Sequence, residues 1–456
     1  MGAIALQALA EETGGQLYGE SVPIQHLKID SREVSAGDLF AAICGQHVDG
    51  HDYVPQAVAA GASAVLTERK VESGTPQLVV SSITHASGRF GYLKRQAFAG
   101  DIIAITGSAG KTTTKNLIAA ALRSSGAVHA TFGNQNNELG VPLTLSGLTD
   151  DYRYGVIEMG AGQSGDIAYL CELARPNVSV CVNASAAHLA HYDSVDAIAT
   201  TKGEIFEGLG GKGLAVINAD QKWSSQWRAQ AGSSRQVTFG LSESADYRAT
   251  DIHHQGLEGT EFQLEGPTFA VSVSLQLAGD QHVSNALAAL AVAIELGVAP
   301  QHAADGVATV TAGIGRGAAK RRAGGGMVID DTYNANPTSL KAAIRALAAR
   351  EGRKALILGD MAELGTRAEE FHAEAGREAR QSGIDLLFTC GPLAGLAGEA
   401  FGEDARCFDS SEDLIKAART LLSPGLTVLI KGSRSARMEQ VADALVCVAQ
   451  DGAIAC

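Results

Sequence analysis

Short apolar runs alternate with segments of helical periodicity along most of the chain, and this alternation predicts an α/β fold. Apolar strands joined by helices form parallel, doubly wound sheets that are covered on both faces. Ligands of such sheets bind beyond the carboxyl ends of the strands, so polar residues at those ends are candidates for a site. The apolar runs of the central part are 102–105, 127–131, 155–159, 178–182 and 214–218.

Changes in this pattern divide the chain into three predicted domains. Residues 1–83 contain short apolar runs around one predicted helix and are expected to form a small N-terminal α/β domain. The central domain, 84–313, contains alternating short strands between Val237 and Leu277, which predict an antiparallel addition to its sheet. After a linker rich in glycine and arginine near 313–326, strands and helices alternate again in a Rossmann-like C-terminal domain, 314–456.

A glycine-rich turn between a strand and a helix, within Asp101–Lys115, is the most informative stretch. Backbone N–H groups in such a turn point at one spot, and the helix dipole adds positive potential there, which favours phosphate. Lys111 can reach the terminal phosphates of a nucleotide, and the Thr112 hydroxyl can coordinate magnesium. The turn is shorter than the general P-loop, because Ile105 stands where that pattern has glycine. The expected phosphate loop comprises Gly107, Ser108, Ala109, Gly110, Lys111, Thr112 and Thr113.

Polar residues near the ends of other central strands offer possible metal ligands. Glu158 could hold a second magnesium ion or orient a water molecule. His188 follows another strand and could complete the shell of that ion, although a surface histidine explains it equally well. Lys202 lies in a segment predicted to begin a helix, where spacing alone favours a solvated side chain.

The third domain repeats this arrangement of polar residues after strands. Asp331 ends its first strand, and the amides of Asn334 and Asn336 follow, so these groups could hold a ribose and a purine. A helix cap with a turn explains the same residues nearly as well. Segment 431–437 also follows a strand and carries three cations that could bind a carboxylate or phosphate. These residues predict a nucleotide-dependent enzyme and leave an acyl-activating ligase, a phosphotransferase and a switch NTPase open.

Composition restricts the partners and the compartment. The 456 residues carry a formal charge of −14, which disfavours general nucleic-acid binding. No apolar run approaches the ~20 residues needed to span a bilayer, and the N-terminus lacks the basic region of a signal peptide. The seven cysteines are scattered, mostly in apolar runs, which is typical of buried free thiols in a reducing compartment. We therefore expect a cytoplasmic protein without nucleic-acid or membrane partners. A monomer is also expected, although the sequence does not determine the oligomeric state.

Several segments together resemble the Mur ligases, the amino-acid-adding enzymes of peptidoglycan synthesis. The matching segments are 106–113, 134–142, 158–160, 187–189, 202–206, 282–286, 315–316 and 330–337. The last of these, with 358–365 and 431–434, resembles the MurF branch, which joins D-alanyl-D-alanine to UDP-N-acetylmuramoyl-tripeptide. Segments 30–32, 37–40 and 49–52 resemble the N-terminal domain of that branch. The resemblance covers nearly the whole chain, in the right order.

The resemblance implies a ligase that depends on ATP and magnesium and acts through an acyl phosphate. It implies that Lys111 and Thr112 hold the phosphates and the first magnesium ion. Glu158 and His188 would ligate magnesium, the latter at a second ion. Lys202 matches the lysine that is carbamylated in this family, and its new carboxylate would bind the second ion. The resemblance thus reverses the expectation that spacing gives for Lys202.

Other matches imply nucleotide and substrate contacts. Residues at ATP-contacting positions are Asn285, Arg316, Asp331, Asn334 and Asn336. Residues expected to bind substrate are Ser31 and Arg32, at the uridine-nucleotide end, and Lys431, Ser433 and Arg434. Asn116, His191 and the basic segment 317–322 depart from the family pattern. These departures bear on metal geometry rather than on the assignment.

Related enzymes match the sequence less well. The ligase that adds the third peptide residue should carry an Asp-Asn-Pro-Arg-like signature, which this chain lacks. A folate polyglutamate synthase shares the core but should lack residues 1–83. A nucleotide-binding switch or scaffold would bind ATP without phosphate release that both substrates stimulate. The sequence leaves open whether the third residue of the tripeptide is diaminopimelate or lysine.

Overall fold

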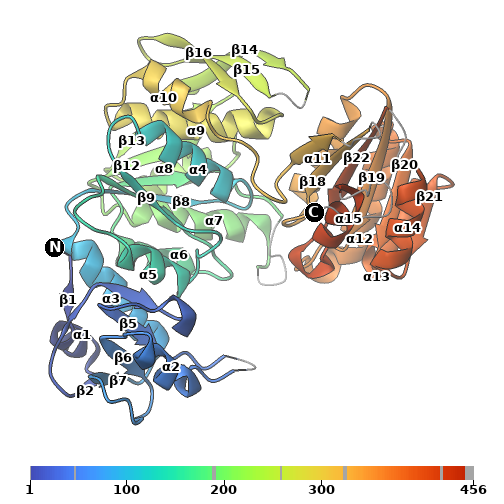
Figure 1. Ribbon diagram of the computed structural model, residues 1–456. Helices are drawn as coiled ribbons and strands as arrows, with labels where there is room; N and C mark the ends of the chain where they lie inside the picture. The colour runs from blue at the N-terminus through green and yellow to red at the C-terminus, as the bar shows by residue number, and fades with distance from the viewer. Residues whose placement is uncertain are drawn as a thin grey trace.

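Three α/β units follow one another along the chain (Figure 1). The computed structural model describes residues 2–45, 48–186, 192–256, 259–321, 326–421 and 425–446. We call the three the N-terminal unit (β1 to β7), the central unit (β8 to β16) and the third unit (β17 to β22). The domain bounds 1–83, 84–313 and 314–456 stay predictions.

The N-terminal unit packs helices on a five-stranded sheet of order β2-β7-β6-β5-β4. The strands of the unit are β1 (Ile4–Ala5), β2 (Gln16–Tyr18), β3 (Pro23–Ile24), β4 (His26–Lys28), β5 (Asp38–Ala41), β6 (Ala64–Thr67) and β7 (Gln77–Val79), of which β1 and β3 form a separate two-stranded sheet. Strand β2 pairs antiparallel with β7, and the other pairs of the five-stranded sheet are parallel. Helix α2 (Val54–Ala59) matches the predicted helix, whereas α1 (Leu6–Thr13) was not expected from the apolar pattern.

Helix α3 (Ile83–Ala97) joins the N-terminal unit to the central unit. Ile83, Ala86 and Phe90 on this helix belong to the N-terminal core. On its other side, a Cβ at Gly91 would lie 3.0 Å from the Cα of Pro142 in the central unit. The absence of that Cβ allows close packing, so one helix is built into the packing of both units.

The central unit is a nine-stranded sheet of order β16-β15-β14-β13-β12-β11-β8-β10-β9. Its strands are β8 (Asp101–Thr106), β9 (Val128–Ala130), β10 (Tyr154–Glu158), β11 (Val178–Cys181), β12 (Leu214–Asn218), β13 (Arg235–Gly240), β14 (Tyr247–His254), β15 (Thr260–Glu265) and β16 (Ala270–Leu275). The predicted parallel, doubly wound sheet is confirmed, and so is an antiparallel addition, formed by β14, β15 and β16. The addition begins later than predicted, because β13 still pairs parallel with β12 and β14.

Helices cover both faces of the central sheet, as parallel strands require. Along β8, Ile103 and Ile105 pack with one set of helices, and Ile102 and Ala104 with the other. One set comprises α4 (Lys111–Leu122), α9 (Asp280–Glu295) and α10 (Pro300–Val307); the other comprises α5 (Gly140–Ser146), α6 (Asp166–Ala174), α7 (Val195–Glu207) and α8 (Ser224–Ala231). The strand order reverses between β8 and β11, so their carboxyl ends flank the crevice where ligands of such sheets bind.

The third unit is a six-stranded sheet of order β17-β18-β22-β19-β20-β21. Its strands are β17 (Ala318–Arg321), β18 (Met327–Asp331), β19 (Arg353–Gly359), β20 (Leu386–Cys390), β21 (Ala405–Phe408) and β22 (Leu426–Lys431), and its helices are α11 (Pro337–Ala348), α12 (Ala368–Gln381), α13 (Pro392–Phe401), α14 (Ser411–Leu421) and α15 (Glu439–Val446). All pairs are parallel except β17 with β18, which confirms a Rossmann-like arrangement. The prediction of a linker over 313–326 is wrong in part, because β17 is an edge strand.

The cysteines agree only partly with the prediction of buried thiols. Within the described ranges all five cysteines are free, and Cys171 and Cys181 are buried. Cys44 and Cys407 are exposed, which corrects the expectation for these two. None of the helices in the described ranges has both the length and the apolar character that a membrane crossing requires.

Candidate functional site

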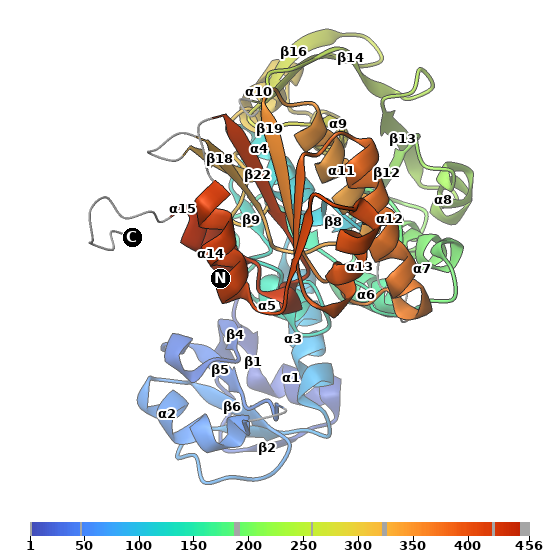
Figure 2. The ribbon, with the colours of Figure 1, turned by 90° about the vertical axis from the view of Figure 1, so that its right-hand side faces the viewer.

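A cavity of about 1120 Å³ lies between the carboxyl ends of the central strands and the third unit. The polar residues that follow β10, β11 and β12 converge on it together with the phosphate loop, as the sheet topology predicts. Figure 1 shows β18 and α11 on the side of the third unit nearest the central sheet, and in Figure 2 the third unit lies in front of the central unit. Predicted site residues that line the cavity are 108–113, Glu158, Lys202, Asn285, Arg316, Asp331, Asn334, Asn336 and Lys431.

Contacts within the protein hold the phosphate loop in shape. Gly110 has a left-handed backbone, with φ of 80°, and a Cβ there would lie 2.7 Å from Asn285 Oδ1. Asn183, which follows β11, accepts a hydrogen bond from the Ala109 N–H at 2.9 Å and donates one to the Ala109 carbonyl at 3.1 Å. Lys111 donates from Nζ to the Gly107 carbonyl at 2.8 Å. The loop therefore needs glycine at position 110, and its lysine folds over it.

Glu158 lies at the end of β10 as a buried carboxylate with both oxygens engaged. The Thr112 hydroxyl donates to Oε2 at 2.8 Å, and Asn136 Nδ2 donates to Oε1 at 2.8 Å. Its backbone N–H donates to Thr131 Oγ1 at 3.0 Å. The structure thus brings together two of the four predicted metal ligands, Thr112 and Glu158. The sequence alone assigns no role to Asn136, although this residue lies in the matching segment 134–142 and follows β9.

Lys202 lies in the middle of α7, with 3% of its surface exposed. Burial and, to a smaller extent, the charge of Lys111 lower its pKa to about 7, and Cys181 opposes both effects. The expectation from spacing, a solvated lysine at a helix start, is therefore wrong on both points. Glu204, two residues along α7, accepts hydrogen bonds from the backbone N–H groups of Gly165 and Ala168, which fixes α7 against the start of α6.

The side chains of the site fit a magnesium ion that binds together with substrate phosphates better than a metal ion that protein side chains alone coordinate. No group of three or more His, Cys, Asp or Glu side chains within the described ranges could hold a metal ion. The Thr112 hydroxyl and the Glu158 carboxylate supply oxygens close together. Magnesium is commonly bound by one or two carboxylates together with the phosphates of a substrate, so these two residues fit it. His188 and His191 lie outside the described residues, and the metal role of His188 stays a prediction.

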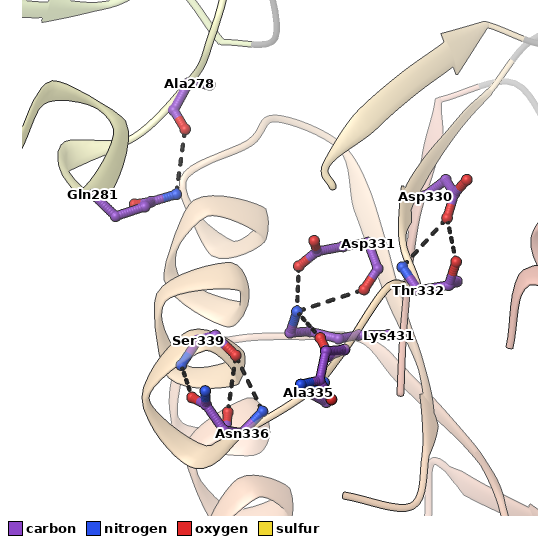
Figure 3. Close-up of polar contacts among 10 residues, drawn as sticks. Ala278, Gln281, Asp330, Asp331, Thr332, Ala335, Asn336, Ser339 and Lys431 are labelled. Atoms are coloured by element: carbon purple, nitrogen blue, oxygen red, sulfur yellow. Dashed lines mark hydrogen bonds and ion pairs between the residues drawn. The ribbon is translucent and has the colours of Figure 1, made fainter. Parts of the chain in front are cut away.

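In the third unit, Lys431 organises the loop that follows β18 (Figure 3). Its Nζ contacts Asp331 Oδ2 at 2.6 Å and donates to the Asn334 carbonyl at 2.9 Å. Lys431 is almost fully buried, so its positive charge interacts with groups of the protein rather than with solvent. It lines the cavity, but in this structure it presents its ammonium to Asp331 rather than to open space.

The two predicted amide side chains of this loop, Asn334 and Asn336, make different contacts. Asn336 is the N-cap of α11: its Oδ1 accepts the Ser339 N–H at 2.8 Å, and Ser339 Oγ accepts the Asn336 N–H at 3.1 Å (Figure 3). The helix-cap interpretation is therefore confirmed for Asn336. Asn334 accepts from the Ala335 N–H at 2.9 Å. Close by, the Arg316 guanidinium lies 3.6 Å from the centroid of the Tyr333 ring.

The remaining predicted substrate residues do not line this cavity. Ser433 is buried and donates to the Asp360 carbonyl at 2.6 Å, whereas Arg434 is exposed near the surface of the third unit. In the N-terminal unit, the Ser31 hydroxyl donates to Gln56 at 2.9 Å, and Arg32 pairs with Asp30 on the surface. The predicted substrate residues are thus spread over two further places in the fold.

The pair Lys431–Asp331 should stabilise the third unit. Replacing Lys431 with Met leaves the Asp331 carboxylate without its cation, so we expect local stability to fall by about 3–5 kcal/mol. Amide hydrogen exchange in β18 and β22 would measure this loss. The matched control is Lys416→Met, which removes an exposed pair with Asp413 and should cost less than about 0.5 kcal/mol. Equal effects of the two variants would contradict the role given to Lys431.

Comparison with known proteins finds three family models that together span most of the chain. Residues 23–92 match the Mur ligase family, catalytic domain. Residues 105–293 match the Mur ligase middle domain, and residues 315–434 match the Mur ligase, glutamate ligase domain. The three matches follow the order of the three units.

Similar proteins match over nearly their whole length. The chain is 38% identical to the UDP-N-acetylmuramoyl-tripeptide–D-alanyl-D-alanine ligase of Escherichia coli, over 97% of this chain and 98% of that protein. A crystal structure of MurF from Acinetobacter baumannii superposes with a TM-score of 0.90 at 32% identity, covering 98% of this chain and 100% of that one. The MurF ligase of Thermotoga maritima in complex with ADP gives a TM-score of 0.81 at 31% identity, with 92% and 97% covered.

Proposed function

The chain belongs to the Mur ligase family, and on that premise we propose that it joins D-alanyl-D-alanine to UDP-N-acetylmuramoyl-tripeptide at the expense of ATP. The observation that carries the proposal is the convergence, in one cavity, of a phosphate loop, the Thr112–Glu158 pair and the buried Lys202. The relatives that match over their full length bear the name of this activity. The cytoplasmic location and the monomeric state stay predictions.

The reaction needs activation, because a free carboxylate is a poor electrophile. A carboxylate oxygen of the tripeptide attacks the γ-phosphorus of ATP, ADP leaves, and an acyl phosphate forms. The amine of D-alanyl-D-alanine then attacks the acyl carbon and gives a tetrahedral intermediate. Loss of phosphate and of one amine proton leaves the new amide. Most of the acceleration in such a scheme comes from positioning and from neutralising phosphate charge.

The phosphate-loop residues are assigned the binding of ATP. Backbone N–H groups of residues 108–113 would surround the phosphates, and Lys111 would leave the Gly107 carbonyl to reach them. Thr112 and Glu158 would hold magnesium. When bound, magnesium supplies positive charge that offsets the charge of the phosphates. Asn285, Arg316 and the loop 331–336 are assigned contacts with the nucleotide.

Lys202 is assigned a second metal contact as a carbamate. Its Nζ attacks carbon dioxide, a proton is released, and an anionic carboxylate replaces the amine. Two observations support this assignment: the side chain is buried next to the phosphate loop, and its pKa of about 7 makes the neutral amine available at physiological pH. His188 completes the proposed set. Ser31 and Arg32 are assigned to the uridine nucleotide, and Lys431, Ser433 and Arg434 to the substrate side of the third unit.

A four-component assay tests the proposal. Phosphate release should require ATP, magnesium, the UDP-linked tripeptide and D-alanyl-D-alanine together, because the acyl phosphate forms on one substrate and is consumed by the other. Omission of any one component should reduce release to the background level. Equal release with D-alanine in place of the dipeptide would contradict the assignment. ATP binding without release stimulated by both substrates would favour a switch or scaffold instead.

A further inference from the structure

Lys115 is a buried cation that the proposed reaction leaves without a role. It lies on α4, one turn after Lys111, and only 4% of its surface is exposed. Its Nζ donates to the Thr131 carbonyl at 2.5 Å. Burial lowers its pKa, and the nearby Glu158 carboxylate opposes that effect. Burying a lysine costs free energy, and one hydrogen bond to a backbone carbonyl offsets only part of that cost.

Thr131, the residue that Lys115 holds, is in direct contact with Glu158. It follows β9, and its Oγ1 accepts the Glu158 backbone N–H at 3.0 Å. Five residues later, Asn136 donates from Nδ2 to Glu158 Oε1 at 2.8 Å, and its carbonyl accepts the Gly160 N–H at 2.7 Å. Side chains of segment 131–136 therefore contact both the backbone N–H and the carboxylate of Glu158, and Lys115 connects the start of that segment to α4.

We propose that Lys115 is a positioning residue that fixes the Glu158 carboxylate through segment 131–136 and thereby sets the affinity for the divalent cation. The inference rests on the proposed function in one respect, namely that Glu158 ligates the metal. Outer residues that orient a metal ligand typically change metal affinity by about 10–100-fold when they are replaced. Lys115 would act in this way without touching metal or substrate.

A direct electrostatic role for Lys115 predicts the opposite sign. An ammonium near the site repels a metal cation, so its removal would tighten cation binding if charge alone mattered. If Lys115 acts by positioning, its removal loosens segment 131–136 and weakens binding. The direction of the change in cation affinity therefore separates the two explanations.

The experiment measures Mn²⁺ binding to the full chain in the presence of ADP by electron paramagnetic resonance, without turnover. We expect Lys115→Met to weaken Mn²⁺ binding by about 10-fold or more, and Lys115→Arg to recover most of the loss. Lys94→Met is the matched control, because Lys94 is equally buried and donates to the Gly2 and Gln25 carbonyls in another part of the fold. This control should lose stability and keep the affinity of the wild type for Mn²⁺.

Thr131→Val provides a second test should Lys115→Met fail to fold. It removes the hydroxyl that accepts the Glu158 N–H and keeps the carbonyl that Lys115 holds, so Mn²⁺ binding should weaken as well. Unchanged or tighter binding in Lys115→Met, or in Thr131→Val where the first variant is unfolded, would overturn the inference. Absence of Mn²⁺ binding in the wild-type complex with ADP would instead count against the proposed function.

Discussion

Replacing Lys111 with methionine is expected to slow phosphate release in the four-component assay by about 10²–10³-fold. The loss has this size because a preorganised cation that faces developing phosphate charge contributes several kcal/mol to the transition state. The loop itself should survive the change, since Asn183 and Gly110 hold its shape and Lys111 adds one contact to Gly107. Steady-state kinetics should show a fall in kcat together with a rise in KM for ATP.

The control for this prediction is Lys212→Met. Lys212 is an exposed lysine of the same unit, so its replacement removes one charge without touching the cavity. Its phosphate release should match that of the wild type. A Lys111 variant that retained more than about a tenth of the wild-type rate would show that the loop binds phosphate mainly through its backbone.

Replacing Lys202 with alanine is expected to reduce activity by about 10²-fold, and acetate should restore part of it. The alanine variant lacks the amine that accepts carbon dioxide, and a small carboxylate can enter the space to supply the missing oxygens. Removal of carbon dioxide and bicarbonate should slow the wild-type enzyme reversibly and leave the variant unaffected. Intact mass measured under bicarbonate should reveal one carbamate in the wild type and none in the variant.

The variant Lys202→Met distinguishes the effect of losing the carboxylate from the effect of losing side-chain volume. Methionine keeps most of the buried stem but fills the space that acetate would occupy, so it should be inactive without rescue. Full activity of Lys202→Ala, or an unmodified amine in the wild type under bicarbonate, would remove the proposed role. In that case the low pKa of the buried amine would need another explanation.

Much of the site could be predicted because a parallel sheet places the ends of its strands together. Glu158 and the phosphate loop follow adjacent strands, β10 and β8, and both were identified from the apolar runs before them. Thr112 lies next to the loop lysine, so its contact with Glu158 follows from the same topology. The pattern of apolar strands therefore predicts which polar residues lie together in the site, as well as the fold.

Contacts between distant elements could not be predicted in the same way. Lys431 pairs with Asp331 across 100 positions, and nothing near either residue signals that pair. Lys202 has polar neighbours in sequence, which suggested solvent, but α7 packs its Lys202 side toward the phosphate loop. Lys115 is similar, since a lysine in the second turn of a helix gives no local sign of burial. Burial depends on which helix face meets the sheet, and spacing leaves that open.

Helix α3 sets the distance between the N-terminal unit and the central unit. Its 15 residues extend for about 22 Å, and two of its sides pack against different units. A continuous helix with both sides packed resists bending, so the N-terminal unit and the phosphate loop should keep a constant separation. If the nucleotide of the substrate binds to the N-terminal unit, as proposed for Ser31 and Arg32, the peptide must have a matching length to bring its carboxylate to ATP. We expect a shortened peptide to bind yet react slowly, because its end falls short.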